Sequence, residues 1–266
     1  MSLDLDALVI AADTAARAGG EVIRAHFGSP PEVREKAPGD WVTAADVASE
    51  DIVRAVLERE TGLPVFGEEA GGERADTGWL VDPLDGTSNF VHGLDAVGVS
   101  VGLVADGEPV VGVVHAPLLA RTYAARKGGG AFRDGRRIHV SGRSPEQAIV
   151  ATGFPFRRKD VLAEYEPVLA AALHGFEDLR RVGAASLDLC WTAEGVFDGY
   201  FELRLGPWDV AAGAVIVREA GGVVTDWAGD GGAWLTSGDI MAAPPGVHEV
   251  LLRIASETDR PGRSNA

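Results

Sequence analysis

The segment Trp79–Phe90 contains two aspartates three positions apart, Asp82 and Asp85, and an apolar stretch typical of a buried strand leads into them. Gly86 and Thr87 follow at once. Carboxylate oxygens are ligands that Mg²⁺ prefers, and a Gly-Thr-Ser sequence that opens a helix would direct backbone amides at a phosphate. The spacing therefore predicts metal and phosphate sites side by side, as phosphate-ester hydrolysis requires. Asp-Pro and Asp-Gly are also ordinary turn dipeptides, so a plain loop is the alternative.

A short apolar strand at residues 65–67 ends in the adjacent carboxylates of Glu68 and Glu69. Two neighbouring carboxylates repel each other unless they are solvated, protonated or bound to a metal. On an exposed loop, which is the commoner case, such a pair has no function. The glutamates therefore support a metal site in combination with the two aspartates and not by themselves.

Asp209 and Asp46 stand in the first turns of two predicted helices. Pro207 at the start and Gly221-Gly222 at the end bound the helix that contains Asp209. Asp209 would there compensate the helix dipole, which is worth about 0.3–1 kcal/mol. Thr43 and Asp46 have the spacing of a capping box, which opens a helix that continues to residue 60. Both aspartates thus have a structural role whether or not they belong to a catalytic site.

Together these segments resemble the inositol monophosphatase family of Mg²⁺-dependent, lithium-sensitive phosphatases, and in particular its bacterial inositol-1-monophosphatase branch. The family's Val-Thr-x-x-Asp, Gly-Glu-Glu, Asp-Pro-Leu-Asp-Gly-Thr-x-Asn-Phe and Trp-Asp-x-Ala-Ala-Gly motifs all occur in order between Thr43 and Gly222. Residues 151–156 and 180–189 resemble segments of the bacterial branch. The resemblance covers nearly the whole chain. It implies an α+β protein with the layered α-β-α-β-α sugar-phosphatase fold, with the site between two halves.

The resemblance implies that Glu68, Asp82 and the Leu84 carbonyl oxygen bind the activating metal, which polarises the attacking water. Asp82 would also bridge to a second metal held by Asp85 and Asp209. The expected cofactor is Mg²⁺, with two or three ions. Clustered metals can neutralise charge, supply the nucleophile and assist the leaving group, so no covalent phospho-enzyme is needed.

Other residues match the family's catalytic and substrate positions. Thr87 would orient the attacking water, backed by Asp46, so that these two residues and Glu68 are the expected catalytic set. Arg204 stands where the family has a glycine, which would alter the loop, place a cation near the substrate or leave an exposed side chain. The expected substrate contacts are Gly86, Thr87, Gly183, Ala185, Glu202 and Asp209.

The run Asn89–Gly93, which contains His92, is common in inositol-type members and favours inositol 1-phosphate as the substrate. Fructose 1,6-bisphosphate, histidinol phosphate and adenosine 3′,5′-bisphosphate are alternatives with the same chemistry. An alternative of another class is an interaction with the transcription machinery, because some bacterial relatives have such a role. The Asp-x-x-Asp spacing argues against haloacid-dehalogenase-like phosphatases, which use Asp-x-Asp. The resemblance further implies a homodimer and inhibition by Li⁺.

Composition limits the other possibilities. A chain of 266 residues with 46% hydrophobic residues can form one large domain or two joined halves. A net charge of −16 argues against nucleic-acid binding, and bound divalent cations would reverse the potential at a site for anions. No apolar run approaches the ~20 residues of a membrane span. The start lacks the basic region of a signal peptide, and a single cysteine, Cys190, predicts a cytoplasmic protein.

Periodicity divides the chain near residue 145. Helical spacing covers Leu5 to Phe27, and Asp106-Gly107 and Asp134-Gly135 indicate hairpins. We predict an N-terminal α+β half, residues 1–145, that carries most metal ligands, and a C-terminal α/β half, residues 146–266, that carries Asp209 and the substrate pocket. The predicted strands are 97–105, 110–115, 122–125, 138–140, 149–151, 199–202 and 222–226, and the later helices are 160–174, 185–195 and 208–220.

Overall fold

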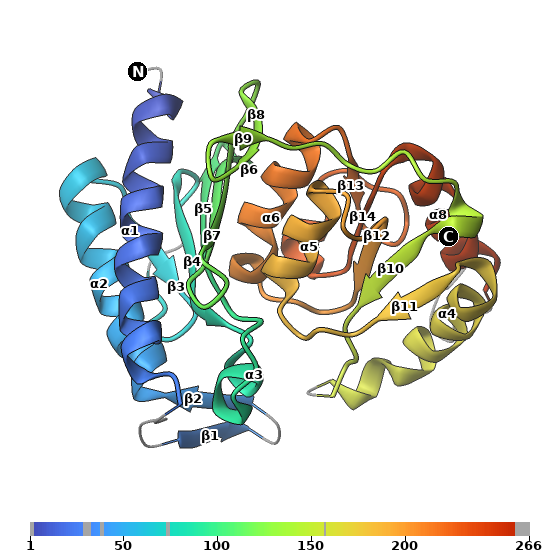
Figure 1. The fold of residues 1–266 in the computed structure, drawn as a ribbon, viewed down its shortest axis with the longest axis horizontal. Helices are drawn as coiled ribbons and strands as arrows, with labels where there is room; N and C mark the ends of the chain where they lie inside the picture. The colour runs from blue at the N-terminus through green and yellow to red at the C-terminus, as the bar shows by residue number, and fades with distance from the viewer. Residues whose placement is uncertain (1–2, 29–32, 38–39, 73–74, 157, 259–266) are drawn as a thin grey trace.

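The computed structural model describes residues 3–28, 33–37, 40–72, 75–156 and 158–258. Within these ranges, helices and sheets stack in the order helices, sheet, helices, sheet, helices (Figure 1). This confirms the predicted α-β-α-β-α layering. The three helical layers are pairs: α1 (Leu5–His26) with α2 (Ala44–Thr61), α5 (Ala185–Ala193) with α6 (Pro207–Glu219), and α4 (Leu162–Gly175) with α8 (Pro245–Glu257).

The larger sheet has seven strands in the order β3-β4-β5-β6-β7-β8-β9, antiparallel except for the parallel pair β3 and β4. Asp106-Gly107 and Asp134-Gly135 form the predicted turns, and all four residues have positive φ. The strands are β3 (Val65–Gly67), β4 (Gly78–Asp85), β5 (Gly98–Ala105), β6 (Glu108–Ala116), β7 (Arg121–Arg126), β8 (Gly130–Arg133) and β9 (Arg136–Arg137).

The predicted strand at residues 138–140 is wrong. The Ile138 amide still donates to the Ala131 carbonyl at 3.0 Å, but the chain then leaves the sheet. The Val140 amide donates instead to the Ala220 carbonyl at 3.1 Å, just beyond the end of α6. Carbonyl groups at a helix C-terminus lack partners within the helix, so this end of α6 competes successfully for the apolar segment.

The smaller sheet has five strands in the order β11-β10-β12-β14-β13. Strand β10 pairs in parallel with both β11 and β12, so the carboxyl ends of these three strands lie at one edge of the sheet. Glu202 and the residues that follow β10 and β11 line a pocket at this edge. Strands β11 and β14 and helix α8 were not predicted from the sequence. The strands are β10 (Ile149–Thr152), β11 (Asp178–Arg180), β12 (Gly199–Glu202), β13 (Val223–Thr225) and β14 (Ile240–Ala243).

Helix α6 joins the two parts of the chain, because it packs against the larger sheet although it follows β12. Gly102 and Gly112 allow this close approach: a Cβ atom would lie 2.9 Å from the Ala212 amide nitrogen at Gly102 and 2.2 Å from the Ala212 carbonyl oxygen at Gly112. The division at residue 145 falls between the two sheets and stays a prediction.

Shorter elements are β1 (Val33–Ala37), β2 (Asp40–Thr43), α3 (Thr87–His92), α7 (Trp234–Ser237) and two 3₁₀ turns, Pro145–Gln147 and Lys159–Val161.

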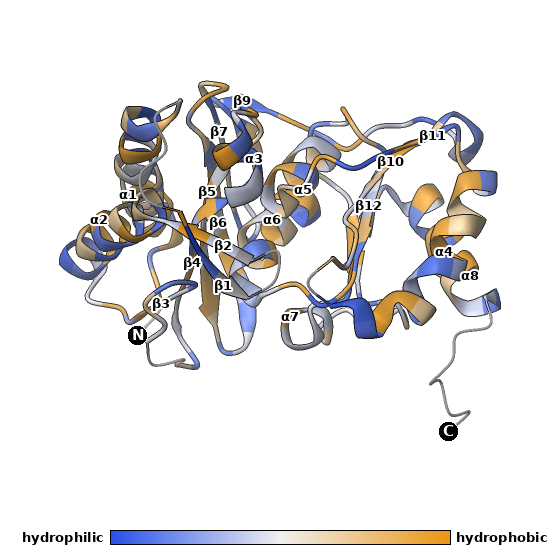
Figure 2. Cartoon of the chain, turned by 90° about the horizontal axis from the view of Figure 1, so that it is seen from below, coloured by the Kyte–Doolittle hydropathy of each residue, from blue (hydrophilic) through white to orange (hydrophobic). Residues whose placement is uncertain are grey.

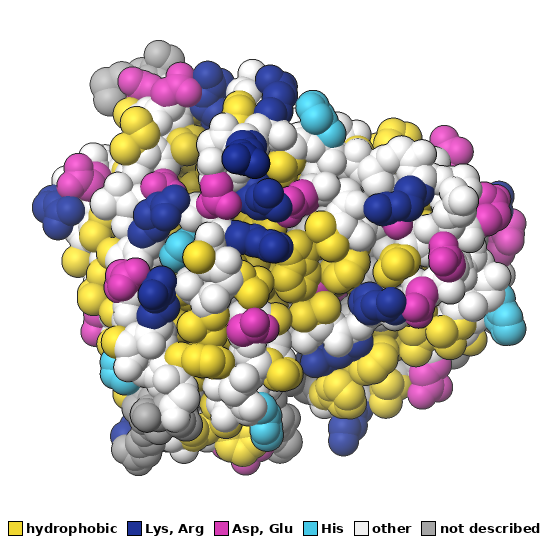
Figure 3. Space-filling model, viewed as in Figure 1, with side chains coloured by type: hydrophobic (Ala, Val, Ile, Leu, Met, Phe, Trp, Pro, Cys, Tyr) yellow, Lys and Arg dark blue, Asp and Glu magenta, His cyan; other side chains and the backbone are white. Residues whose placement is uncertain are grey.

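Apolar side chains fill the spaces between adjacent layers, and Figure 2 shows the apolar faces of strands and helices turned toward each other. Trp79 packs between the larger sheet and the outer helices, and Leu187 and Cys190 pack in the middle of the molecule. On the face seen in Figure 3, basic and acidic side chains are interspersed. Among the described residues, no helix has the length and apolar character needed to cross a membrane.

Candidate active site

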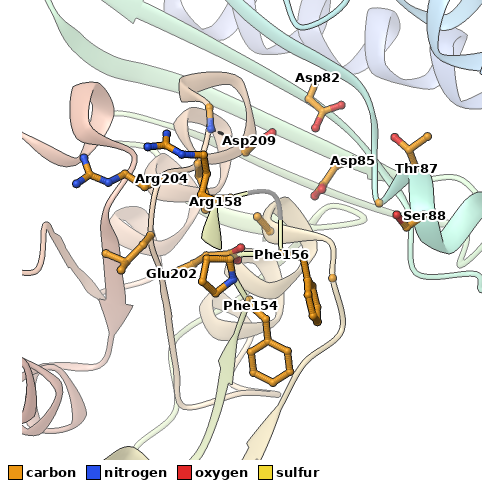
Figure 4. A pocket seen from close by; sticks show the side chains of 18 of the residues that line it. Asp82, Asp85, Thr87, Ser88, Phe154, Phe156, Arg158, Glu202, Arg204 and Asp209 are labelled. Atoms are coloured by element: carbon orange, nitrogen blue, oxygen red, sulfur yellow. Dashed lines mark hydrogen bonds between the residues drawn. The ribbon is translucent and has the colours of Figure 1, made fainter. Parts of the chain in front are cut away.

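Strand β4 carries both aspartates of the Asp-Pro-Leu-Asp segment. Asp82 pairs with Ser100 and Asp85 with Gly98, so the pairing shifts between them and forms a bulge. The Ser49 hydroxyl, from α2, donates to the Pro83 carbonyl at 2.9 Å and holds this bulge. The irregular strand places both carboxylates on one pocket, as Figure 4 shows.

Three carboxylates from distant parts of the chain converge at this pocket. Oxygen atoms of Glu68, Asp82 and Asp209 all lie within 4.8 Å of one another. Glu68 follows β3, and Asp209 lies in the first turn of α6, where its carboxylate also accepts the Gly206 amide at 2.7 Å. The predicted first-turn position of Asp209 is therefore confirmed.

Electrostatics at this cluster favour a bound cation. Burial raises the pKa of Asp82 well above its usual range, and the charges of Glu68, Asp85 and Asp209 raise it further. Burial and the charges of Glu68 and Asp85 likewise raise the pKa of Asp209. A divalent cation would offset this repulsion, and an all-oxygen donor set suits a hard ion such as Mg²⁺. The residues therefore fit the predicted metal.

Asp85 lies beside this cluster and has a second attachment. Its Oδ2 atom accepts the Ser186 amide at 2.7 Å and the Ser186 hydroxyl at 2.5 Å. These bonds satisfy donors in the first turn of α5, where negative charge is favourable. Because its charge raises the pKa of both Asp82 and Asp209, Asp85 is part of the same electrostatic unit. Its role as a ligand of a second metal stays a prediction.

Thr87 and Asp46 form a buried pair behind the cluster. The Thr87 hydroxyl lies 3.1 Å from both Asp46 Oδ1 and the Leu84 carbonyl oxygen. A hydroxyl has one proton and two lone pairs, so Thr87 can donate to one of them and still accept from a water. Asp46 also accepts the Thr43 amide at 2.8 Å, which confirms the predicted capping box. Burial raises the pKa of Asp46, and hydrogen bonds from Thr43 and Thr87 oppose this shift.

These residues surround a cavity of about 310 Å³. Every predicted site residue lines it except Asp46, which lies behind Thr87. Gly86 has a φ of 87°, and a Cβ atom there would lie 2.9 Å from the Ala96 carbonyl oxygen, so glycine is required. A Cβ atom at Gly153 would lie 1.9 Å from the Glu202 carboxylate, so this glycine makes room for Glu202. The Tyr200 hydroxyl donates to Glu202 as well.

Glu50 is a buried carboxylate on α2 that was not predicted from the sequence. It accepts the Glu69 amide at 2.8 Å and the Ala70 amide at 2.9 Å, and it pairs with Arg54 at 3.1 Å. These bonds fix the turn that carries Glu68. The available signal was the Glu50–Arg54 pair, four residues apart on a helix, although that pattern is also common on exposed helix faces.

We expect Glu50→Gln to raise the Mg²⁺ concentration required for half-maximal activity about tenfold, as is typical when a group that orients a metal ligand is lost. An amide nitrogen would replace one of the two acceptors, which should also lower the free energy of unfolding by about 1–3 kcal/mol. Magnesium titrations and urea denaturation measure both effects. Glu58→Gln, at a half-exposed position on the same helix, is the matched control. An unchanged Mg²⁺ requirement in Glu50→Gln would contradict this role.

Residues 153–156, Arg158 and Arg181 also line the pocket. Most of them fall in the segments that resemble the bacterial branch, so the signal for them was the family pattern and not recognisable chemistry. His92, at the end of α3, is exposed and is not among the lining residues. His92 therefore indicates similarity to inositol-type family members and does not indicate a contact with the substrate.

Five alternating layers and a partly buried cluster of carboxylates on a pocket are what a metal-dependent phosphatase requires. The chain belongs to one family of this class, since the model of the inositol monophosphatase family matches residues 4–260.

Three known proteins show the extent of the similarity. A protein of Neisseria meningitidis named putative Nus factor SuhB is 43% identical, over 91% of this chain and 95% of its own length. The fructose-1,6-bisphosphatase/inositol-1-monophosphatase of Aquifex aeolicus is 38% identical, over 92% of this chain and 94% of its own. The solved structure of inositol monophosphatase from Anabaena (Nostoc) superposes with a TM-score of 0.85 at 32% identity, covering 97% of this chain and 99% of that one.

Proposed function

We propose that this protein hydrolyses a phosphate monoester of a small polyol or sugar, with inositol 1-phosphate as the first candidate, and that it uses Mg²⁺. The observation that carries this proposal is the convergence of Glu68, Asp82 and Asp209 beside the Thr87–Asp46 pair, in a cavity of about 310 Å³. Pockets for small molecules have volumes in this range. The names of the Aquifex and Anabaena relatives support the same chemistry.

In this proposal, Glu68, Asp82 and Asp209 hold the metal, with Asp85 and the Leu84 carbonyl oxygen as further ligands. Bound Mg²⁺ supplies charge neutralisation and lowers the pKa of water.

The remaining groups position the water and the ester. The Thr87 hydroxyl accepts a hydrogen bond from the attacking water while it donates to Asp46. Gly86 and Thr87 present backbone amides to the phosphate. The Glu202 carboxylate accepts a hydrogen bond from Tyr200 and packs over Gly153, which has no Cβ atom in its way. In this position Glu202 accepts hydrogen bonds from hydroxyl groups of the substrate.

We expect Thr87→Val to lower kcat about a hundredfold, because it removes the hydroxyl that orients the water but keeps the branched shape. Thr87→Ser keeps the hydroxyl and should retain most of the activity. Steady-state rates of phosphate release, with circular dichroism to check folding, measure the difference. Equal losses in the two variants would show that shape and not the hydroxyl matters.

Substrate choice is tested by phosphate release from inositol 1-phosphate, fructose 1,6-bisphosphate, histidinol phosphate and adenosine 3′,5′-bisphosphate at saturating Mg²⁺. The proposal predicts the highest kcat/KM for inositol 1-phosphate. A higher value for another ester would keep the metal chemistry and reassign the substrate.

A second candidate function is an interaction with the transcription machinery, since the Neisseria relative is named a putative Nus factor. The net charge of −16 is compatible with a basic protein partner. An Asp82→Asn variant distinguishes the two functions in the cell, because a purely interacting protein would keep its role without the carboxylate.

The homodimer, inhibition by Li⁺ and location in the cytoplasm remain predictions. Sedimentation velocity would measure the oligomeric state, and millimolar Li⁺ in the phosphate-release assay would measure sensitivity. The single buried Cys190 is compatible with a reducing compartment.

A further inference from the structure

Two exposed phenylalanines follow β10 and form part of the pocket wall. Phe154 and Phe156 both line the cavity, and Figure 4 shows them on the side of Glu202, away from Asp82. The exposed fraction is 36% for Phe154 and 59% for Phe156. All nine phenylalanines of the chain lie in its described part, and only these two are exposed. Exposed apolar surface is unfavourable in water, so a pair of aromatic rings at a pocket indicates a ligand that covers them.

Contacts with neighbouring groups hold these two rings, Phe154 and Phe156, which we call the aromatic wall. Their ring centroids lie 5.7 Å apart at an interplanar angle of 79°. Phe154 also meets the buried Tyr165 edge to face, with centroids 6.2 Å apart and an angle of 75°. Aromatic pairs prefer such geometries. A buried ring thereby fixes the position of the aromatic wall at the pocket.

A cation contacts Phe156 as well. The guanidinium carbon of Arg181 lies over the Phe156 ring, 5.5 Å from its centroid, which is within the range of a cation–π interaction. Arg181 itself lines the pocket. Phe156 remains 59% exposed in spite of this contact, so much of its ring is open to a ligand.

The groups around the aromatic wall indicate the shape of that ligand. Glu202 lies on the same cavity and can accept hydrogen bonds from hydroxyl groups. A cyclic polyol has hydroxyl groups around its edge and C–H bonds on its faces. Its hydroxyl groups can therefore bind Glu202 while a C–H face packs on Phe156, because the face of an aromatic ring carries partial negative charge. An open-chain polyol has no rigid face and would lose more conformational freedom for the same contact.

We infer that Phe156, held by Phe154 and Arg181, packs against the C–H face of a cyclic leaving group and thereby selects ring esters over open-chain esters. This inference rests on the proposed function and narrows its substrate class to phosphate monoesters of cyclic polyols and sugars. Phe156 takes part in recognition of the leaving group and not in metal binding, because Asp82 and Asp85 lie on the other side of the pocket (Figure 4). Removal of its ring should therefore affect ring esters selectively.

The kinetic test compares inositol 1-phosphate with glycerol 2-phosphate, an open-chain ester that also has free hydroxyl groups. The parent should prefer inositol 1-phosphate in kcat/KM. Phe156→Ala should reduce that preference about tenfold, the scale of one lost aromatic contact, and Phe156→Tyr, which keeps the ring, should retain it. Leu173→Ala is the matched control, because Leu173 is an exposed apolar residue of α4 that does not line the pocket. No preference in the parent, or an equal loss on both esters, would overturn the inference.

A binding test does not depend on hydrolysis. Saturation-transfer difference NMR, with irradiation of the aromatic protons, detects ligand protons that lie against aromatic rings. With inositol 1-phosphate in EDTA, we expect transfer to the ring C–H protons in the parent, Phe156→Tyr and Leu173→Ala, and a severalfold weaker signal in Phe156→Ala. No transfer in the parent, or equal transfer in all four proteins, would exclude the contact. Absence of Mg²⁺-dependent release from both esters, with transfer intact, would instead refute the proposed function and keep the role of the aromatic wall.

Discussion

Replacement of Asp82 by asparagine is expected to lower kcat at least about a thousandfold and to leave the metal-free protein as stable as the parent or more stable. Asp82 is buried among Glu68, Asp85 and Asp209, and its charge is therefore unfavourable without a cation. Asparagine keeps an oxygen that can accept the Leu84 amide, now at 2.9 Å. The substitution thus removes a ligand and a repulsive charge together.

Phosphate release and urea denaturation in EDTA measure the two effects of Asp82→Asn. Asp178→Asn removes a charge from an exposed aspartate paired with Arg180 and serves as the control. A large loss of stability with retained kcat would contradict the account, because Asp82 would then be a structural residue. Loss of both would require a crystal structure of the variant to show whether the pocket survives.

Mg²⁺ is expected to raise the melting temperature, and to raise it more at pH 8 than at pH 6. The pKa values of Asp82 and Asp209 are raised in the folded metal-free protein, first by burial and then by the neighbouring carboxylates. An unfolded carboxyl group titrates near pH 4 (about 3.9 for Asp). Their contribution to stability is therefore fully present below that pH and is lost as the pH rises through the raised values. Mg²⁺ competes with these protons, so its stabilising effect grows with pH.

Differential scanning fluorimetry at both pH values, with saturating Mg²⁺ or with EDTA, measures this difference. The pKa values of His115 and His248 are lowered by burial, so protonation of the unfolded chain destabilises the protein as the pH falls below about 6.5. That effect is present with and without Mg²⁺ and cancels in the comparison. In Asp82→Asn the gain should largely vanish. A gain that is equal at both pH values, or larger at pH 6, would contradict the prediction.

Local signals allowed much of the fold to be predicted. The capping box at Thr43, the proline and glycines around α6 and the two Asp-Gly hairpins each depend on a few adjacent residues, and all are present in the structure. The strand at residues 199–202 has the predicted bounds. The layering of the sheets came from the family resemblance, because periodicity does not determine which faces meet.

The misses have identifiable causes. Helix α8 has buried Val247, Leu251 and Ala255 at intervals of four residues, so its pattern was present and went unused. Strand β11 has only three residues and is largely exposed, which removes the alternation that marks a strand. The alternation of Ile138 and Val140 was taken for a strand, but the Val140 amide bonds to the Ala220 carbonyl beyond the end of α6 and not to the sheet.

The residues assigned to the candidate site lie around one pocket, but most of the contacts that hold them were not predicted. The family pattern named Glu68, Asp82 and Asp209, and these three do converge. The bonds from Asp85 to Ser186 and from Glu50 to the turn after Glu68 join residues that no local pattern relates. Such contacts depend on how whole layers pack, which the spacing of residues along the chain does not encode.

The most direct test of the central claim is phosphate release from inositol 1-phosphate, first in EDTA and then during titration with Mg²⁺. We predict no release in EDTA, a saturable rise with Mg²⁺ in the parent, and no comparable rise in Asp82→Asn. Equal release with and without Mg²⁺, or full activity of Asp82→Asn, would contradict the assignment of the carboxylate cluster as the metal centre of a phosphatase.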